Sequence, residues 1–122
     1  MRISSIKTTI ACLAVTTLVC GCGKQHEAES VVKDFLETNL QASDYTVSFS
    51  GIDSTRHVTD SVVDKMRADA ANSKMFKRGI KYAGTDQQYI YTKVKICIGG
   101  DTTSHTFYLD PKVSQVVAFK EN

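Results

Sequence analysis

The sequence predicts an α+β domain in which two helices pack on an antiparallel sheet of about four strands, in the order α-β-α-β-β-β. Three observations support this class. Residues 29–40 carry apolar side chains at helical spacing, residues 45–52 alternate between apolar and polar, and residues 89–98 alternate again before a glycine-containing turn. A sheet with one apolar face needs helices to cover it, so these elements are expected to share one core.

The first predicted helix covers residues 29–40. Its apolar side chains recur every three or four residues and form one stripe of Val31, Val32, Phe35, Leu36 and Leu40. The second predicted helix begins at a cap provided by Thr59 or Asp60 and runs to about Ala71. Its expected core-facing residues are Val62, Val63, Met66 and Ala70. The following segment, Lys74 to Lys81, has no clear periodicity.

The strands follow from alternation and from turn residues. The first covers residues 45–52, with Gly51 marking a bulge near its end. The next covers residues 89–98 and is followed by Gly100-Asp101, a dipeptide typical of a two-residue hairpin turn. That turn pairs Ile96 with His105, Val94 with Phe107, Thr92 with Leu109, Lys95 with Thr106 and Lys93 with Tyr108. The closing strand, residues 113–119, is apolar on both faces, so its register stays open.

The first 21 residues have the layout of a secretory signal. Arg2 and Lys7 give a positive start, and residues 8–19 form an apolar run shorter than the ~20 residues that a membrane-spanning helix takes. The run ends in Val-Cys-Gly-Cys, which resembles the lipobox of bacterial lipoproteins. That resemblance implies cleavage before Cys22, acylation of Cys22 and a membrane anchor, and Gly23 after it favours the outer membrane. The alternative is a soluble secreted protein in which Cys22 is incidental.

These features divide the chain into a signal peptide at 1–21, a lipid-anchored tether at 22–28 and a single α+β domain at 29–122. Removal of the signal peptide takes away two of the 15 basic side chains and leaves 13 against 13 acidic ones. The mature chain is therefore neutral, and no charge excess favours nucleic acid as a partner. Cys97 is the one cysteine left beside the lipid site, so stability has to come from an apolar core rather than from an internal disulfide.

The order of elements over residues 29–119 resembles the cystatin-like and nuclear-transport-factor-2-like superfold. That resemblance implies a helix lying across a curved antiparallel sheet. A second candidate is the helix-helix-sheet fold of small outer-membrane assembly lipoproteins. The predicted strand at residues 45–52 lies between the two helices and argues against this second fold.

The titratable residues form no recognisable catalytic or metal-binding pattern. His26, His57 and His105 lack the spacing of metal ligands, and no cysteine pair accompanies them. Cys97 has no identifiable base and is expected to be a small residue in a strand. Asp60 and Asp64 share a helix face that is expected to contact water. We therefore predict no catalytic residue, no metal and no cofactor.

Two surfaces could bind a partner. The first is a polar sheet face formed by Tyr89, Tyr91, Lys93, Lys95 and Tyr108. Interleaved tyrosines and lysines suit a protein, a glycan or an anionic ligand, and the alternative is an ordinary solvated face. The second is a basic cluster of Lys74, Lys77, Arg78 and Lys81. It could touch phospholipid head groups, and the alternative is again a solvated face.

The sequence thus favours a membrane-anchored lipoprotein of the cell envelope that acts as a non-enzymatic binding module. Its expected partners are the membrane, through the lipid, and an envelope protein or a glycan. One alternative is a small-molecule-binding or enzymatic protein with a pocket between sheet and helix. Another is an inhibitor or immunity-type protein. Cystatin-type inhibition uses a glutamine–valine–glycine loop, and here Gln115-Val116-Val117 falls in the predicted closing strand instead.

Overall fold

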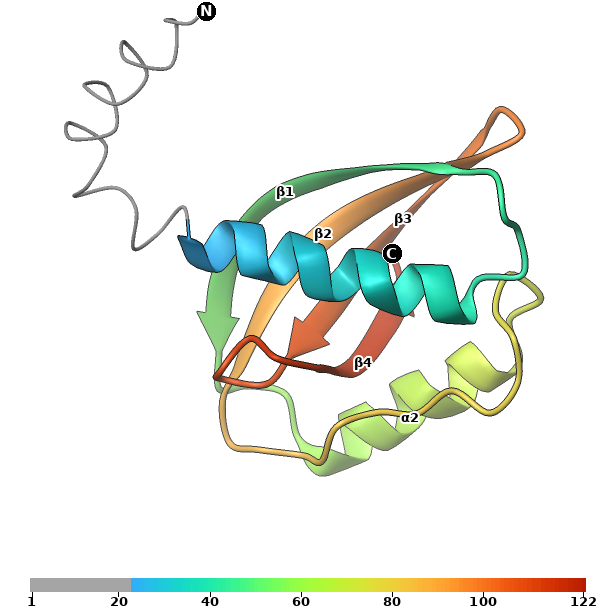
Figure 1. Cartoon of the computed structure of the whole chain (residues 1–122). Helices are drawn as coiled ribbons and strands as arrows, with labels where there is room; N and C mark the ends of the chain where they lie inside the picture. The colour runs from blue at the N-terminus through green and yellow to red at the C-terminus, as the bar shows by residue number, and fades with distance from the viewer. Residues whose placement is uncertain (1–22) are drawn as a thin grey trace, which may run out of the picture.

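The computed structural model describes residues 23–122, and the predicted signal peptide and lipid site lie outside them. The fold is α+β with the predicted α-β-α-β-β-β order and an antiparallel sheet in strand order β1-β2-β3-β4 (Figure 1). An N-terminal helix, helical over residues 23–39, precedes the other elements. These are β1 (Thr46–Thr55), α2 (Asp60–Ala71), β2 (Tyr89–Ile98), β3 (Asp101–Leu109) and β4 (Val116–Glu121).

The N-terminal helix begins earlier than the sequence predicted. Residues 23–28 are helical, so the expected flexible tether at 22–28 is wrong over these six residues. Ala28 lies four residues before Val32 and is fully buried, which extends the apolar stripe by one turn. The Gln25 side chain donates hydrogen bonds to Glu29 and to the Ser50 carbonyl of β1. The helix therefore packs on the sheet from its first described turn.

The β2–β3 hairpin turns one residue earlier than predicted. Gly99 and Gly100 form the turn with φ of 58° and 91°, and β2 pairs with β3 from Ile98↔Asp101 onward. A tight hairpin turn needs positive φ at both central residues, which two glycines adopt without steric cost. The predicted pairing is therefore wrong by two residues throughout, and Val94 lies opposite His105. Because a shift of two keeps each side chain on the same face, the predicted facing survives.

The last strand, β4, has a defined register on β3. Phe119 lies opposite Phe107, and Ala118 lies opposite Tyr108. The strand starts at Val116 rather than at residue 113, because Val113 belongs to the preceding turn with φ of 55°. Both faces of β4 are apolar because each contributes to a different core.

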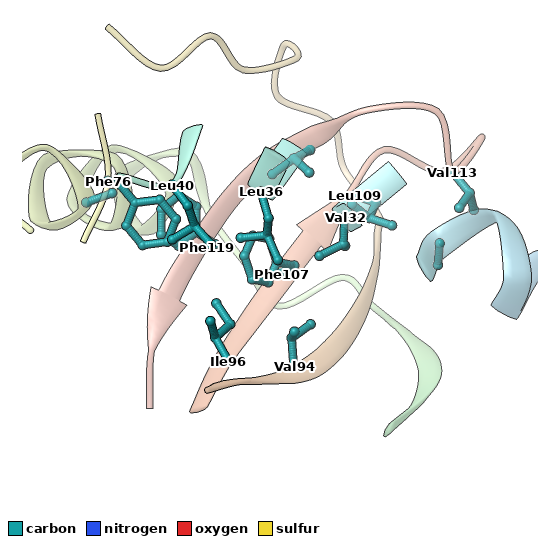
Figure 2. Close-up of a cluster of buried hydrophobic side chains, with 13 residues drawn as sticks. Val32, Leu36, Leu40, Phe76, Val94, Ile96, Phe107, Leu109, Val113 and Phe119 are labelled. Carbon is teal, nitrogen blue, oxygen red and sulfur yellow. The ribbon is translucent and has the colours of Figure 1, made fainter. Parts of the chain in front are cut away.

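The larger core lies between the N-terminal helix and the sheet (Figure 2). The helix crosses one face of the sheet and contributes Val32, Leu36 and Leu40, which pack on side chains of β2, β3 and β4 (Figure 1). The sheet side chains of this core are Val94, Ile96, Phe107, Leu109, Val116 and Phe119. All of these are at most 4% exposed. The space between helix and sheet, where an enclosed pocket was the alternative prediction, is occupied by side chains.

A smaller core joins α2 to β4 and to the first residue of β2. Val63 and Met66 of α2 pack with Tyr89, Val117 and Ala118. Tyr89 precedes Ile90 in the strand, so its side chain lies on the face opposite to the one that the N-terminal helix covers. The sheet thus carries apolar contacts on both sides. Val62, expected to face the core, is 44% exposed.

Candidate functional site

Tyr89 is not part of the predicted binding face, because its side chain is fully buried in the smaller core. Its hydroxyl oxygen accepts a hydrogen bond from the Asp86 backbone N–H at 2.8 Å. A buried tyrosine normally finds such a partner for its polar end. The assignment of Tyr89 to a surface is therefore wrong: α2 covers that end of the face.

The other four predicted residues do share the face that the N-terminal helix leaves uncovered. Tyr91 and Tyr108 are cross-strand partners, and their ring centroids lie 5.9 Å apart. Burial raises the pKa of Tyr108, and Tyr91 adds to the effect. Lys93 and Lys95 are exposed opposite Thr106 and Ser104. Lysines and tyrosines therefore meet on this face.

The histidines and the cysteine are placed apart. His57 is exposed in the loop after β1, and Cys97 is half-buried near the end of β2. His105 is 1% exposed among Phe76, Phe107 and Phe119, and its Nδ1 atom has no hydrogen-bond partner among the described residues. Burial lowers the pKa of His105, against a smaller opposite effect of Glu121. Within residues 23–122 no three His, Cys, Asp or Glu side chains are grouped to hold a metal.

The structure reveals a cleft that the sequence did not indicate. It has a volume of about 530 Å³ and lies between the N-terminal helix, residues 79–83 and residues 114–116. Phe35 of the helix and Tyr82 of the facing segment both line it, and their rings pack together with centroids 6.1 Å apart. Asp34 of the helix and Lys81 of the facing segment place one charge of each sign at its exposed rim. The cleft lining therefore combines apolar side chains with polar ones.

The helix supplies one wall of the cleft because of its periodicity. Val31, Phe35, Thr38 and Asn39 recur at spacings of three and four, on the face beside the buried stripe. Phe35 also packs edge-on against Phe107 and Phe119, with ring centroids 5.9 Å and 5.6 Å away. These contacts anchor the Phe35 ring at the border between the core and the cleft.

The segment after α2 supplies the opposite wall. Its backbone is fixed at two points: Lys77 N–H donates to the Asn39 carbonyl at 2.7 Å, and Ala83 N–H donates to the Val116 carbonyl at 2.9 Å. One bond joins the segment to the end of the N-terminal helix and the other joins it to β4. This non-repeating stretch is therefore ordered by tertiary contacts rather than by its own periodicity.

Arg67 of α2 holds the second wall from behind. Its Nε donates to the Val117 carbonyl at 3.0 Å, and its Nη2 donates to the Ala83 carbonyl at 2.8 Å. The guanidinium carbon lies 4.9 Å from the centroid of the Tyr82 ring. Burial raises the pKa of Tyr82, and Arg67 opposes the rise. Tyr82 thus stays protonated near neutral pH and is held between a cation and the cleft.

The predicted basic cluster lies at the C-terminal end of the N-terminal helix, where Lys77 meets Asn39. Seventeen helical residues, 23–39, separate that end from the predicted lipid site, which is about 25 Å along the helix axis. Among residues 23–122 no helix is both long and apolar enough to cross a membrane.

Comparisons with protein-family models, with curated proteins and with solved structures found no match to this chain.

The sequence analysis missed the cleft residues because the second wall lies in a segment without a helix or strand period. One signal was present: Phe76, Ile80 and Tyr82 are large apolar residues among lysines, which indicates that part of the segment packs inward.

Proposed function

We propose that the protein is a lipid-anchored lipoprotein of the cell envelope whose domain binds a segment of another envelope protein without transforming it. The cleft lined by Phe35 and Tyr82 carries this proposal. Its volume of about 530 Å³ is comparable to the about 300–1,000 Å³ of small-molecule pockets and leaves room for part of a peptide. Aromatic side chains accept an apolar side chain of a partner. A rim with one acidic and one basic group suits a peptide segment whose side chains carry both charges.

The titratable groups of the cleft support binding rather than catalysis. Asp34 and Lys81 are exposed to water at the rim. Tyr82 has a pKa raised by burial, so its hydroxyl remains a neutral donor and its ring a contact surface. A general base works best with a pKa close to the working pH, and the raised pKa of Tyr82 moves away from it.

Backbone strain next to the cleft gives further support. Val113 holds φ of 55°, in the left-handed region that β-branched residues seldom adopt, and its side chain is 3% exposed against the N-terminal helix (Figure 2). Such strain is of order 1–3 kcal/mol and is concentrated near functional sites. The strained turn leads directly into Ser114 and Gln115, which border the cleft.

The proposed anchor rests on the Val-Cys-Gly-Cys sequence. Residue 23 is already helical and Ala28 is buried. A lipid on Cys22 therefore holds the domain near the bilayer surface with no flexible spacer over residues 23–28.

Metabolic labelling with a tagged fatty acid tests the anchor. We expect the protein expressed from its full-length gene to carry the label and to sediment with membranes, and the Cys22→Ser variant to lose both properties. Cys97→Ser is the matched control, since Cys97 lies in β2, and it should retain both. Equal labelling of the wild type and Cys22→Ser rejects the anchor.

Site-specific photocrosslinking in cells tests the cleft. A photoreactive residue at Thr38, an exposed position at the cleft, should give one discrete protein adduct. A photoreactive residue at Lys93, on the uncovered sheet face, is the matched control and should give none. The charge reversals Asp34→Lys and Lys81→Glu should each reduce the Thr38 adduct at least fivefold. An adduct obtained from Lys93 alone would move the binding surface to the sheet face.

A further inference from the structure

A second cavity of about 330 Å³ adjoins the cleft and shares Gly79 and Tyr82 with it. Three of its lining residues are cationic: Arg67, Lys77 and Arg78. The remainder of the lining is apolar or small, with Ala71, Ile80 and Tyr82, and includes no carboxylate. Positive charge therefore converges here beside apolar surface, although the mature sequence as a whole is neutral.

Arg67 is already positioned for a ligand. Its two hydrogen bonds go to backbone carbonyls, which orient the guanidinium but do not neutralise its charge. They use two of the five N–H donors of the group and leave three. Among residues 23–122 the only ion pair joins Lys65 to Asp69, so no described carboxylate pairs with Arg67. Stacking on Tyr82 limits its motion further. A fixed, partly buried cation with spare donors is a preorganised anion contact.

Lys77 and Arg78 add two exposed cationic side chains to a backbone that a hydrogen bond joins to the N-terminal helix. Both side chains are exposed, while the neighbouring Phe76 is 4% exposed and the Lys77 N–H is bonded to the N-terminal helix. Gly79 follows with φ of 78°, a left-handed turn that glycine adopts readily. The turn carries the chain from the two cations directly to Ile80 and Tyr82.

We propose that this basic pocket binds a phosphoryl group that carries an apolar substituent. Three cations around one cavity exceed the one or two negative charges of a phosphate group, and arginine offers the bidentate geometry that phosphate oxygens accept. The wall formed by Ala71, Ile80 and Tyr82 contacts the organic part of the ligand. The site goes beyond the proposed protein-binding cleft, although the two share Gly79 and Tyr82.

The same chemistry has two sources, a lipid head group and a soluble phosphate ester. The pocket lies about 25 Å along the N-terminal helix from residue 23, so its distance from the bilayer depends on how the domain is tilted. The experiment therefore includes one probe for each source.

Amide chemical shifts measured by NMR at low salt test the proposal. The protein is expressed from its full-length gene with ¹⁵N labelling and kept in zwitterionic detergent micelles. Phenyl phosphate is the soluble probe, and micelles doped with phosphatidylglycerol are the lipid probe. We expect saturable shifts at residues 77–80 and at the Arg67 Nε–H with one of the two, which identifies the source. Phenyl phosphate should bind at least fivefold more tightly than inorganic phosphate if the source is soluble.

Variants locate the site. Lys77→Ala/Arg78→Ala should weaken binding of the responsive probe at least tenfold. Lys93→Ala/Lys95→Ala removes the same charge from β2, outside the pocket lining, and should change binding less than twofold. Arg67→Lys keeps the charge but loses the planar guanidinium group that bonds two phosphate oxygens at once, and it should weaken binding at least threefold. Equal losses in the two double variants, or shifts that stay linear with both probes, would overturn the proposal. The Thr38 adduct is a separate measurement, so failure of this proposal can be told apart from failure of the protein-binding cleft.

Discussion

Arg67 and Tyr82 stack with 4.9 Å between the guanidinium carbon and the ring centroid, beside β4 at one edge of the sheet. β4 is an edge strand, and its Val116 and Val117 carbonyls accept hydrogen bonds from Ala83 N–H and Arg67 Nε. An edge strand with open carbonyls is a template for unwanted pairing. One side chain of α2 thus protects the sheet and supports a wall of the cleft.

Replacement of Arg67 should therefore be destabilising. Arg67→Ala removes two hydrogen bonds from a charged donor and the stacking contact, and we expect a loss of roughly 2–4 kcal/mol in the free energy of unfolding. Arg67→Lys should fall between this variant and the wild type, because an ammonium cannot reproduce the fork. Urea denaturation followed by circular dichroism measures both.

Lys65→Ala is the matched control for Arg67. Lys65 lies on the same helix in an exposed pair with Asp69 at 3.1 Å, and such a pair contributes at most about 1 kcal/mol. Equal destabilisation by Lys65→Ala and Arg67→Ala would show that the Arg67 contacts do not hold the edge of the sheet.

His105 predicts a dependence of stability on pH. Burial lowers its pKa below the ordinary value of 6.5, so the unfolded chain takes up a proton at a pH where the folded protein does not. The stability that His105 contributes as a neutral side chain should therefore be fully present above about pH 6.5. As the pH falls below that value, the free energy of unfolding should decrease by up to about 1.4 kcal/mol per pH unit. Glu121, Asp69 and Lys120 line the small cavity beside His105, and the carboxylate of Glu121 opposes the pKa shift.

Thermal denaturation between pH 7.5 and 5 measures this effect. His105→Phe places an apolar ring among the neighbouring aromatic rings and should flatten the profile without loss of stability at pH 7.5. A slope unchanged in His105→Phe contradicts the assignment.

Tyr89 should behave as a core residue and Tyr91 as a surface residue. Tyr89→Ala leaves a cavity between α2 and the sheet and should lower the free energy of unfolding by about 3–5 kcal/mol. Tyr89→Phe removes only the bond from Asp86 N–H and should lower it by about 1 kcal/mol. Tyr91→Ala loses one cross-strand aromatic contact and should lower it by about 1 kcal/mol or less. Chemical denaturation measures all three variants. A larger loss of stability in Tyr91→Ala than in Tyr89→Ala would refute the burial of Tyr89.

Asp110 should stabilise the turn between β3 and β4. Burial raises its pKa, but hydrogen bonds from the Ser114 hydroxyl and from the Gln115 and Ser114 backbone N–H groups outweigh burial and lower it below 3.8. Its contribution is therefore present above about pH 3.8 and is lost as the pH falls through the depressed value. Asp110→Ala should lower the free energy of unfolding by about 1–3 kcal/mol at pH 7. An unchanged urea midpoint would contradict this.

The hairpin shows how far a sequence pattern reaches. Alternation in residues 89–98 predicted which side chains share a face, since the side-chain period of a strand is two. It did not predict the turn, because Gly99-Gly100 and Gly100-Asp101 are both plausible, and only the positive φ at both glycines decides between them.

The sequence by itself determined the α+β class, the order of the elements and the helix stripe of Val32, Leu36 and Leu40, because each depends on a local period of side chains. Only the tertiary structure decided that Tyr89 is covered by α2 and that residues 77–83 form a cleft wall. The physical reason is that these positions depend on contacts between distant residues, such as Arg67 with Val117 and Lys77 with Asn39. No local period records such contacts, and the cleft and the basic pocket both depend on them.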